Sequence, residues 1–235
     1  MAQPILEVRN ITCERSERTL FKSMSFGIEP GTLVRIAGSN GAGKTTLLRL
    51  LTGLMRPLEG EILWRGTPLR EAAHDFWREL CYIGHRNGVK DDLTALENLR
   101  INCRIASLEA REEDMIRALV EVGLGDFIDV PVGQLSQGQR RRVALARLWL
   151  SGSSVIWMLD EPFTALDVKA VARLAEIIAE HVRSGGVVIY VTHQEVDVGD
   201  VNRLEIRPED FAPRRRTAQE RALDDLTAEE AAKAE

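Results

Sequence analysis

The chain contains little cysteine, and its cysteines are not spaced for a metal or for disulfide bonds. Cys13, Cys81 and Cys103 are odd in number, lie far apart and form no C-x-x-C pair. Such spacing suggests neither a zinc site nor the disulfide framework of a small secreted domain. A reducing compartment such as the cytoplasm therefore fits the sequence.

Long apolar runs and an excess of basic charge are also lacking. Residues 1–4 have neither the basic nor the apolar part of a signal peptide, and apolar runs such as residues 187–191 are far too short to span a bilayer. We therefore expect that any action at a membrane needs a partner that spans it. The formal net charge of -5 gives no overall field for gripping nucleic acid, so no nucleic-acid partner is expected.

The length of 235 residues and the hydrophobic content of 44% suit one α/β domain with a small inserted or appended piece. Strand patterns alternate with helical ones, which predicts a parallel sheet with helices on both faces. A mostly helical stretch precedes residue 155, with a capping-box pattern at Thr94 and Glu97 and helical spacing over residues 109–122. The predicted strands are residues 5–8, 33–37, 60–64, 155–159 and 187–192.

The most informative stretch lies between a predicted strand and a predicted helix. Glycines in a turn let backbone N–H groups point at phosphate oxygens, and a following helix N-terminus adds its positive dipole end. A lysine at the helix start reaches the β and γ phosphates, and the next hydroxyl can ligate Mg²⁺. The stretch fills every fixed position of this P-loop pattern and predicts a nucleoside triphosphate site rather than a Gly-rich turn. Its residues are Gly38, Ser39, Asn40, Gly41, Ala42, Gly43, Lys44 and Thr45, and Thr46 in the helix that follows is also expected to bind the nucleotide.

Two adjacent carboxylates end an apolar strand downstream of the P-loop. Strand alternation is expected to point Asp160 and Glu161 to opposite sides, so that they do different jobs. Asp160 can hold Mg²⁺ or its water shell, and Glu161 can orient or deprotonate an attacking water. A pair of acids at a strand end is common in loops, and the upstream P-loop favours the catalytic interpretation.

A second helix start has two interpretations. In the first, Ser136 caps a helix, Gln139 completes a capping box, and the helix continues to Trp149. In the second, the exposed N–H groups, with Gly138 allowing close approach, bind the γ-phosphate of a nucleotide. The residues alone leave both open. Asp167 is likewise placed to cap a helix that ends at residues 185–186.

These motifs, with Ala165-Leu166-Asp167 and His193, occur in the order and spacing of an ATP-binding cassette, and the chain resembles that family from Leu6 to Arg207. The resemblance implies a P-loop ATPase of ABC type over residues 1–207. Its fold would have a mostly parallel core sheet, an N-terminal antiparallel part and a helical subdomain inserted at about residues 87–153.

The same resemblance implies a head-to-tail dimer with two ATP molecules sandwiched between the copies. Ser136 and Gly138, with Gln139, would complete the nucleotide site of the opposite copy. Asp167 would communicate between the two sites, and His193 would contact the γ-phosphate and help to position Glu161.

A narrower resemblance, to the haem-exporter ATPases of cytochrome c maturation, rests on several stretches. It implies membrane subunits of a haem export complex, a periplasmic destination for haem, and a peripheral place on the cytoplasmic face of the inner membrane. An exporter of another substrate is the alternative, and it stays open whether haem itself crosses or ATP releases a haem-loaded chaperone. The stretches are residues 13–15, 18–21, 83–90, 93–99, 141–150 and 160–165.

The chain departs from the general cassette pattern at two places. His85 stands where most cassettes have a glutamine that senses Mg²⁺. We therefore expect His85 at the nucleotide site. A histidine that forms hydrogen bonds within its loop is expected there rather than a haem ligand. No aromatic residue for adenine stacking occurs in residues 12–19, where Arg15 either stacks or is solvated. Residues 208–235 are expected to form a charged tail, solvated or as a short surface helix.

Overall fold

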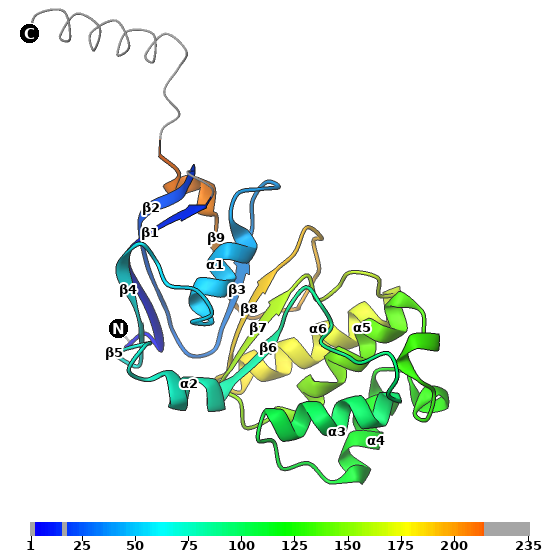
Figure 1. Cartoon of the computed structure of the whole chain (residues 1–235). Helices are drawn as coiled ribbons and strands as arrows, with labels where there is room; N and C mark the ends of the chain where they lie inside the picture. The colour runs from blue at the N-terminus through cyan, green and yellow to red at the C-terminus, as the bar shows by residue number, and fades with distance from the viewer. Residues whose placement is uncertain (1–2, 16–17, 214–235) are drawn as a thin grey trace, which may run out of the picture.

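The computed structural model describes residues 3–15 and 18–213, which form two sheets and a helical segment (Figure 1). The four-stranded sheet has the order β2-β1-β4-β5 and is antiparallel. The five-stranded sheet has the order β6-β7-β8-β3-β9 and is parallel throughout. The predicted α/β fold, with an N-terminal antiparallel part, a parallel core and a helical insert, is confirmed.

The strands are β1 (Leu6–Arg15), β2 (Arg18–Ile28), β3 (Thr32–Ile36), β4 (Glu59–Trp64), β5 (Thr67–Pro68), β6 (Leu80–Ile83), β7 (Ile156–Asp160), β8 (Val187–Val191) and β9 (Asn202–Ile206). The helices are α1 (Lys44–Leu51), α2 (Ala73–Glu79), α3 (Ala95–Ile105), α4 (Glu112–Glu121), α5 (Gln137–Leu145) and α6 (Val168–Arg183). Short 3-10 helices cover Gly125–Phe127, Val132–Gln134, Ala146–Leu150 and Pro208–Phe211.

The parallel sheet is buried on both faces, which is why β7 and β8 read as continuous apolar runs. Alternate residues of one strand enter different cores: Met158 packs with α1 and the antiparallel sheet, whereas Trp157 packs with α5 and α6. Helix α1 accordingly lies between the two sheets, and α6 covers the opposite face of the parallel sheet (Figure 1).

The segment between β6 and β7 has its own core, built from α3, α4, α5 and the 3-10 helix Ala146–Leu150. The capping box predicted at Thr94 and Glu97 is present at the start of α3. The helix predicted to continue to Trp149 is wrong at its end, because α5 stops at Leu145 and the chain tightens into a 3-10 helix, a common way for a helix to end. The proposed subdomain boundaries at residues 87 and 153 enclose this core.

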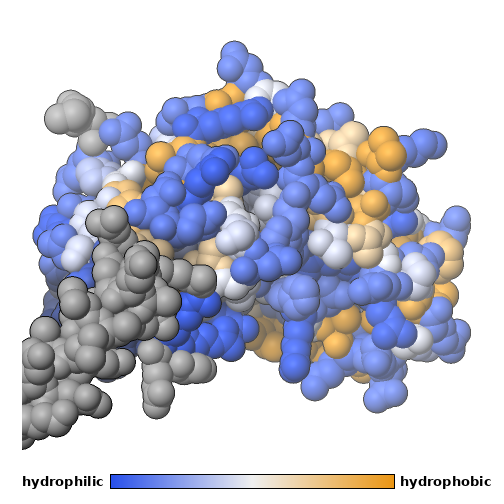
Figure 2. All heavy atoms as spheres, turned by 90° about the horizontal axis from the view of Figure 1, so that it is seen from above, coloured by the Kyte–Doolittle hydropathy of each residue, from blue (hydrophilic) through white to orange (hydrophobic). Residues whose placement is uncertain are grey.

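The surface seen from above is mostly hydrophilic, with hydrophobic side chains gathered on the side of the helical segment (Figure 2). The exposed large hydrophobic residues of α3 and α4 are Ile101, Ile105 and Val120. None of the helices in the described part of the chain is both long and apolar enough to cross a membrane. The charged residues 214–235 of the predicted tail lie outside the described residues.

Candidate functional site

The candidate site lies where neighbouring strands of the parallel sheet end. Because the carboxyl ends of parallel strands meet at one edge, the segments that follow β3, β7 and β8 are brought together there. They carry the P-loop, Glu161 and His193. A cavity of about 470 Å³ opens between them, lined by Arg15, Arg18, Leu20, Asn40, Gly41, Gly43, Lys44, Thr45, Thr46, Glu161, Val191 and His193.

The P-loop is shaped by its glycines. Gly38, Gly41 and Gly43 have φ values of 132°, 79° and 94°, a region that favours glycine. Helix α1 begins directly after Gly43, and among the described residues no side chain caps its first turn, so its first N–H groups are available to an anion. The Lys44 side chain bends back along the loop, where its Nζ donates to the carbonyls of Gly38 at 2.7 Å and Ser39 at 2.9 Å. The loop thus fits a polyphosphate.

Thr45 and Asp160 form the candidate cation site. The Thr45 hydroxyl donates to Asp160 Oδ1 across 3.5 Å, at the end of β7. Burial raises the pKa of Asp160, while the charges of His85, Arg141 and Arg49 and the Thr45 hydrogen bond act to lower it. A hydroxyl and a carboxylate are both hard oxygen donors, so this pair fits Mg²⁺.

Glu161 and His193 both line the cavity and lie next to each other. His193 Nε2 lies 3.4 Å from Glu161 Oε1, and the histidine side chain is 52% exposed whereas the glutamate side chain is 16% exposed. The Glu161 N–H donates to the Val191 carbonyl at 2.9 Å, which ties the end of β7 to the end of β8. Strand β7 stops at Asp160 and Glu161 adopts a left-handed conformation with φ 52°, so strand alternation does not extend to Glu161. The separate neighbours of the two acids come from this turn.

Arg141 of α5 was missed as a site residue by the sequence analysis. It is only 5% exposed, and burial lowers its pKa. One guanidinium nitrogen donates to Asp160 O at 2.7 Å and Glu161 O at 3.1 Å. The other donates to Gly84 O and Asn87 Oδ1, both at 3.0 Å. Arg141 therefore joins the loop after β6 to the two acids, and no spacing in the sequence pointed to this contact.

His85 is exposed in that same loop. It is near enough for its charge to act on the pKa of Asp160, but it is not among the residues that line the cavity. Arg15, in contrast, does line the cavity beside Arg18 and Leu20. The position at which an arginine was expected either to stack on adenine or to be solvated therefore borders the site.

The residues at the start of α5 and α6 lie elsewhere. Ser136 and Gln139 form the predicted capping box, and Asp167 caps α6 by accepting from the Ala170 N–H at 2.9 Å. Asp167 also accepts from Arg142 at 3.0 Å. A Cβ at Gly138 would collide with the Ala165 carbonyl, so glycine is needed for close packing there. Within the described chain, these residues do not line the 470 Å³ cavity.

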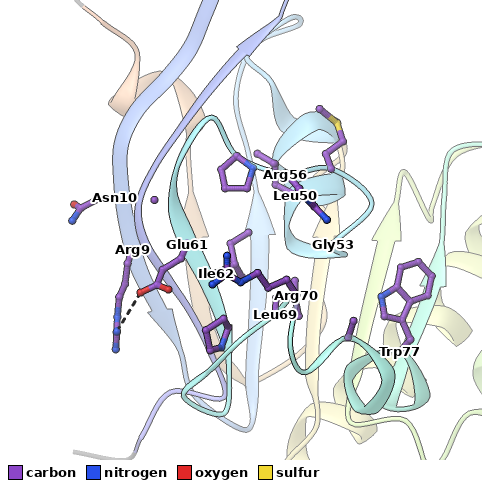
Figure 3. A pocket seen from close by; sticks show the side chains of 15 residues that line it. Arg9, Asn10, Leu50, Gly53, Arg56, Glu61, Ile62, Leu69, Arg70 and Trp77 are labelled. Carbon is purple, nitrogen blue, oxygen red and sulfur yellow. Dashed lines mark ion pairs between the residues drawn. The ribbon is translucent and has the colours of Figure 1, made fainter.

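A larger hollow of about 740 Å³ lies between the antiparallel sheet, the end of α1 and Trp77 of α2 (Figure 3). It is lined partly by apolar side chains such as Leu50, Ile62 and Leu69. Its lining includes no P-loop residue and neither Glu161 nor His193. The phosphate-binding geometry belongs to the smaller cavity.

Comparisons with known proteins point to one family. The model of the family described as ABC transporter matches residues 21–164. The cytochrome c biogenesis ATP-binding export protein CcmA of Escherichia coli O157:H7 is 53% identical over 196 residues, which cover 83% of this chain and 92% of that protein. Its counterpart in Escherichia coli strain K12 is 52% identical over the same share of both chains.

Solved structures agree with these relatives. A putative ABC transporter ATP-binding protein from Pyrococcus furiosus superposes with a TM-score of 0.75 at 25% identity and covers 88% of this chain and 99% of that one. A dimeric ATP-binding cassette in a post-hydrolysis state, bound to ADP and Pi, superposes with a TM-score of 0.70 at 26% identity, with 80% and 88% covered.

Proposed function

Because this chain belongs to the ABC transporter family of ATP-binding proteins, we propose that it is the ATP-hydrolysing subunit of a haem export complex used in cytochrome c biogenesis. The relatives of 53% and 52% identity are named as ATP-binding export proteins of cytochrome c biogenesis. The observation that carries the ATPase activity is the meeting of the P-loop, Glu161 and His193 around one cavity.

The P-loop would bind the phosphates of ATP. Its N–H groups and the start of α1 would hold the phosphate oxygens, and Lys44, from beside Gly38 and Ser39, would bridge the β and γ phosphates. Thr45 and Asp160 would hold Mg²⁺, which when bound supplies positive charge to the phosphates. Arg15, which lines the cavity, would lie against the adenine.

Glu161 would act on the attacking water. Its carboxylate would take the proton as the water oxygen attacks the γ-phosphorus, and the ADP oxygen would leave with the electrons of the broken bond. His193, 3.4 Å away, would hold the Glu161 side chain in place and contact the γ-phosphate. Arg141 would keep the backbone of both acids fixed through its hydrogen bonds to their carbonyls.

A second copy of the chain would complete the site. Ser136, Gly138 and Gln139 start a helix away from the cavity of their own chain, where their N–H groups could meet the γ-phosphate held by a partner copy. Asp167 would lie near both sites of such a nucleotide-sandwich dimer. A dimeric cassette among the structural relatives supports this arrangement.

The proposed complex also contains integral membrane subunits. The chain would sit peripherally on the cytoplasmic face of the inner membrane and couple ATP hydrolysis to subunits that deliver haem to a periplasmic chaperone. His85, in the exposed loop after β6, would transmit closure of the site to these subunits rather than bind ATP.

A deletion strain tests the proposal directly. Cells without the gene, or with Lys44→Ala in its place, should make haem and apocytochromes normally yet lack covalent c-type cytochromes. Haem staining of denatured membrane and periplasmic fractions measures this, because thioether-bound haem survives denaturation. Normal c-type cytochromes in the deletion strain, with no second gene copy, would reject haem export and leave an ABC ATPase that serves another substrate.

A further inference from the structure

Glu209 lies in the 3-10 helix Pro208–Phe211, directly after the edge strand β9. Strand β9 pairs in parallel with β3, and the Ala37 N–H donates to the Ile206 carbonyl at 2.9 Å. The segment after β9 therefore emerges beside the P-loop, which follows β3. Pro208 is buried and Phe211 packs against the main core, so this helix has a fixed position.

The Glu209 carboxylate contacts the first residues of the P-loop. Its Oε1 accepts a hydrogen bond from the Ser39 N–H at 3.2 Å. Gly38, with φ 132°, faces the same carboxylate, and a Cβ at this position would collide with it. Glu209 Oε2 is buried and has no hydrogen-bond partner in the described part of the chain.

One peptide group links this carboxylate to Lys44. The Gly38 carbonyl accepts from Lys44 Nζ at 2.7 Å, and the N–H of the same peptide group, that of Ser39, donates to Glu209. Its carbonyl thus faces a cation and its N–H faces an anion, and hydrogen bonds joined in this way polarise and strengthen each other.

We propose that Glu209 is a positioning residue of the nucleotide site, which fixes the Gly38–Ser39 peptide and, through it, Lys44. A loop held in its binding conformation loses less conformational freedom when a ligand binds. The acceptor for Ser39 comes from a segment near the C-terminus and not from the P-loop itself, so this segment sets the affinity for ATP. The proposal rests on the proposed ATPase function.

The test measures Mg-ATP binding by the full chain with a fluorescent ATP analogue, and KM and kcat in the assembled complex. Glu209→Ala should weaken binding and raise KM by about fivefold to tenfold, the effect of losing one hydrogen bond of ordinary strength, with kcat changed less than about twofold. Glu209→Gln should restore most of the affinity, because its amide oxygen can accept from Ser39. Glu209→Asp should resemble Glu209→Ala, because the shorter side chain withdraws the carboxylate.

Asp210→Ala is the matched control, since it removes the same charge from the adjacent exposed position and should bind Mg-ATP like the parent. The proposal is overturned if Glu209→Ala binds like the parent, if Glu209→Gln and Glu209→Ala lose affinity equally, or if Asp210→Ala matches Glu209→Ala. If Lys44→Ala also binds like the parent, the nucleotide site itself is wrong. Should Glu209→Ala not fold, parent-like affinity in Glu209→Asp overturns the proposal and weakened affinity there supports it.

Discussion

Asp160 is a buried carboxylate that has to be ionised in order to hold a cation. Its 2% exposure and its raised pKa show the cost of placing this charge at the end of a buried strand. The hydroxyl of Thr45 and the positive charge of Arg141 oppose that cost. A divalent cation would add to them, so the proposed metal site and the buried carboxylate stabilise each other.

Lys44→Ala should abolish tight Mg-ATP binding or turnover. The substitution removes the charge that would neutralise the β and γ phosphates during transfer. Equilibrium binding and ATPase rates in the assembled complex measure this, with Lys22→Ala, an exposed position on β2, as the control. Near-normal hydrolysis by Lys44→Ala would contradict the P-loop assignment.

Glu161→Gln should keep ATP binding and slow hydrolysis by about 100-fold or more, the usual contribution of a general base. The glutamine keeps the shape of the side chain but takes no proton from water. The ATP-bound dimer should therefore accumulate, and size-exclusion chromatography with and without Mg-ATP detects it. Parent-like hydrolysis would show that Glu161 is not the catalytic carboxylate; a variant that stays monomeric would show that the dimer requires the membrane subunits.

At the scale of elements, two helices begin with the same capping box and differ in their proposed roles. Thr94 of α3 and Ser136 of α5 each accept from the N–H of the third helical residue at 3.2 Å. Only the start of α5 is proposed to meet the nucleotide of a partner copy. Comparing Thr94 with Ser136 therefore distinguishes the effect of an N-cap on stability from the effect of a phosphate contact on activity.

Thr94→Ala and Ser136→Ala should each lower the free energy of unfolding by about 1 kcal/mol, the usual cost of a lost N-cap. ATPase activity at a temperature where both variants are folded should fall only in Ser136→Ala. Denaturant unfolding and ATPase assays in the complex measure the two effects. Equal ATPase activity in both variants would leave Ser136 with the structural role alone.

The elements found from the sequence are those with a strong local pattern. The buried strands β7 and β8 and the N-cap of α6 are confirmed, because apolar runs and capping residues act locally. Strand β2 was missed because its pairing with β1 contains register shifts that break the alternation. The edge strand β9 is largely exposed and has little apolar signal.

In the candidate site, too, the residues found from the sequence are those with a local pattern. The P-loop glycines are needed for the backbone conformation of the loop, and their spacing is visible in the sequence. Arg141 and Glu209 have no such local pattern. Arg141 lies in the run Arg140–Arg142, which resembles a solvated face, and Glu209 lies in the segment expected to be a charged tail. Their partners are backbone groups 19 and 170 residues away, so only the folded chain brings them together.

At the scale of the whole molecule, His181 links α6 to the parallel sheet, and its protonation should make the stability of the fold depend on pH. Its ring, on α6, stacks on Trp157 of β7 with centroids 3.9 Å apart. Its Nε2 is buried and has no hydrogen-bond partner in the part of the chain that the structure describes. Burial lowers the pKa of His181 from its ordinary value of 6.5, so the folded state favours the neutral ring.

The free energy of unfolding should therefore fall as the pH drops below about 6.5, since each unit of pKa lowering corresponds to about 1.4 kcal/mol. The unfolded chain takes up the proton near that pH, and the folded chain does so only at its lower pKa. The contribution of neutral His181 to stability is fully present above the pKa of the unfolded chain. It is lost as the pH falls from that pKa to the lower pKa of the folded chain. Denaturant unfolding at pH 7.5, 6.5 and 5.5 measures the loss.

His181→Phe keeps an aromatic ring on Trp157 and removes the titrating group, so its stability should change less over this range than that of the parent. His74→Gln replaces an exposed histidine and should retain the pH dependence of the parent. A parent-like decline in His181→Phe would place the pH sensitivity at another group. If the stability of His181→Phe alone becomes less dependent on pH, the pH sensitivity belongs to the contact between α6 and β7. This contact is part of the packing that covers one face of the parallel sheet.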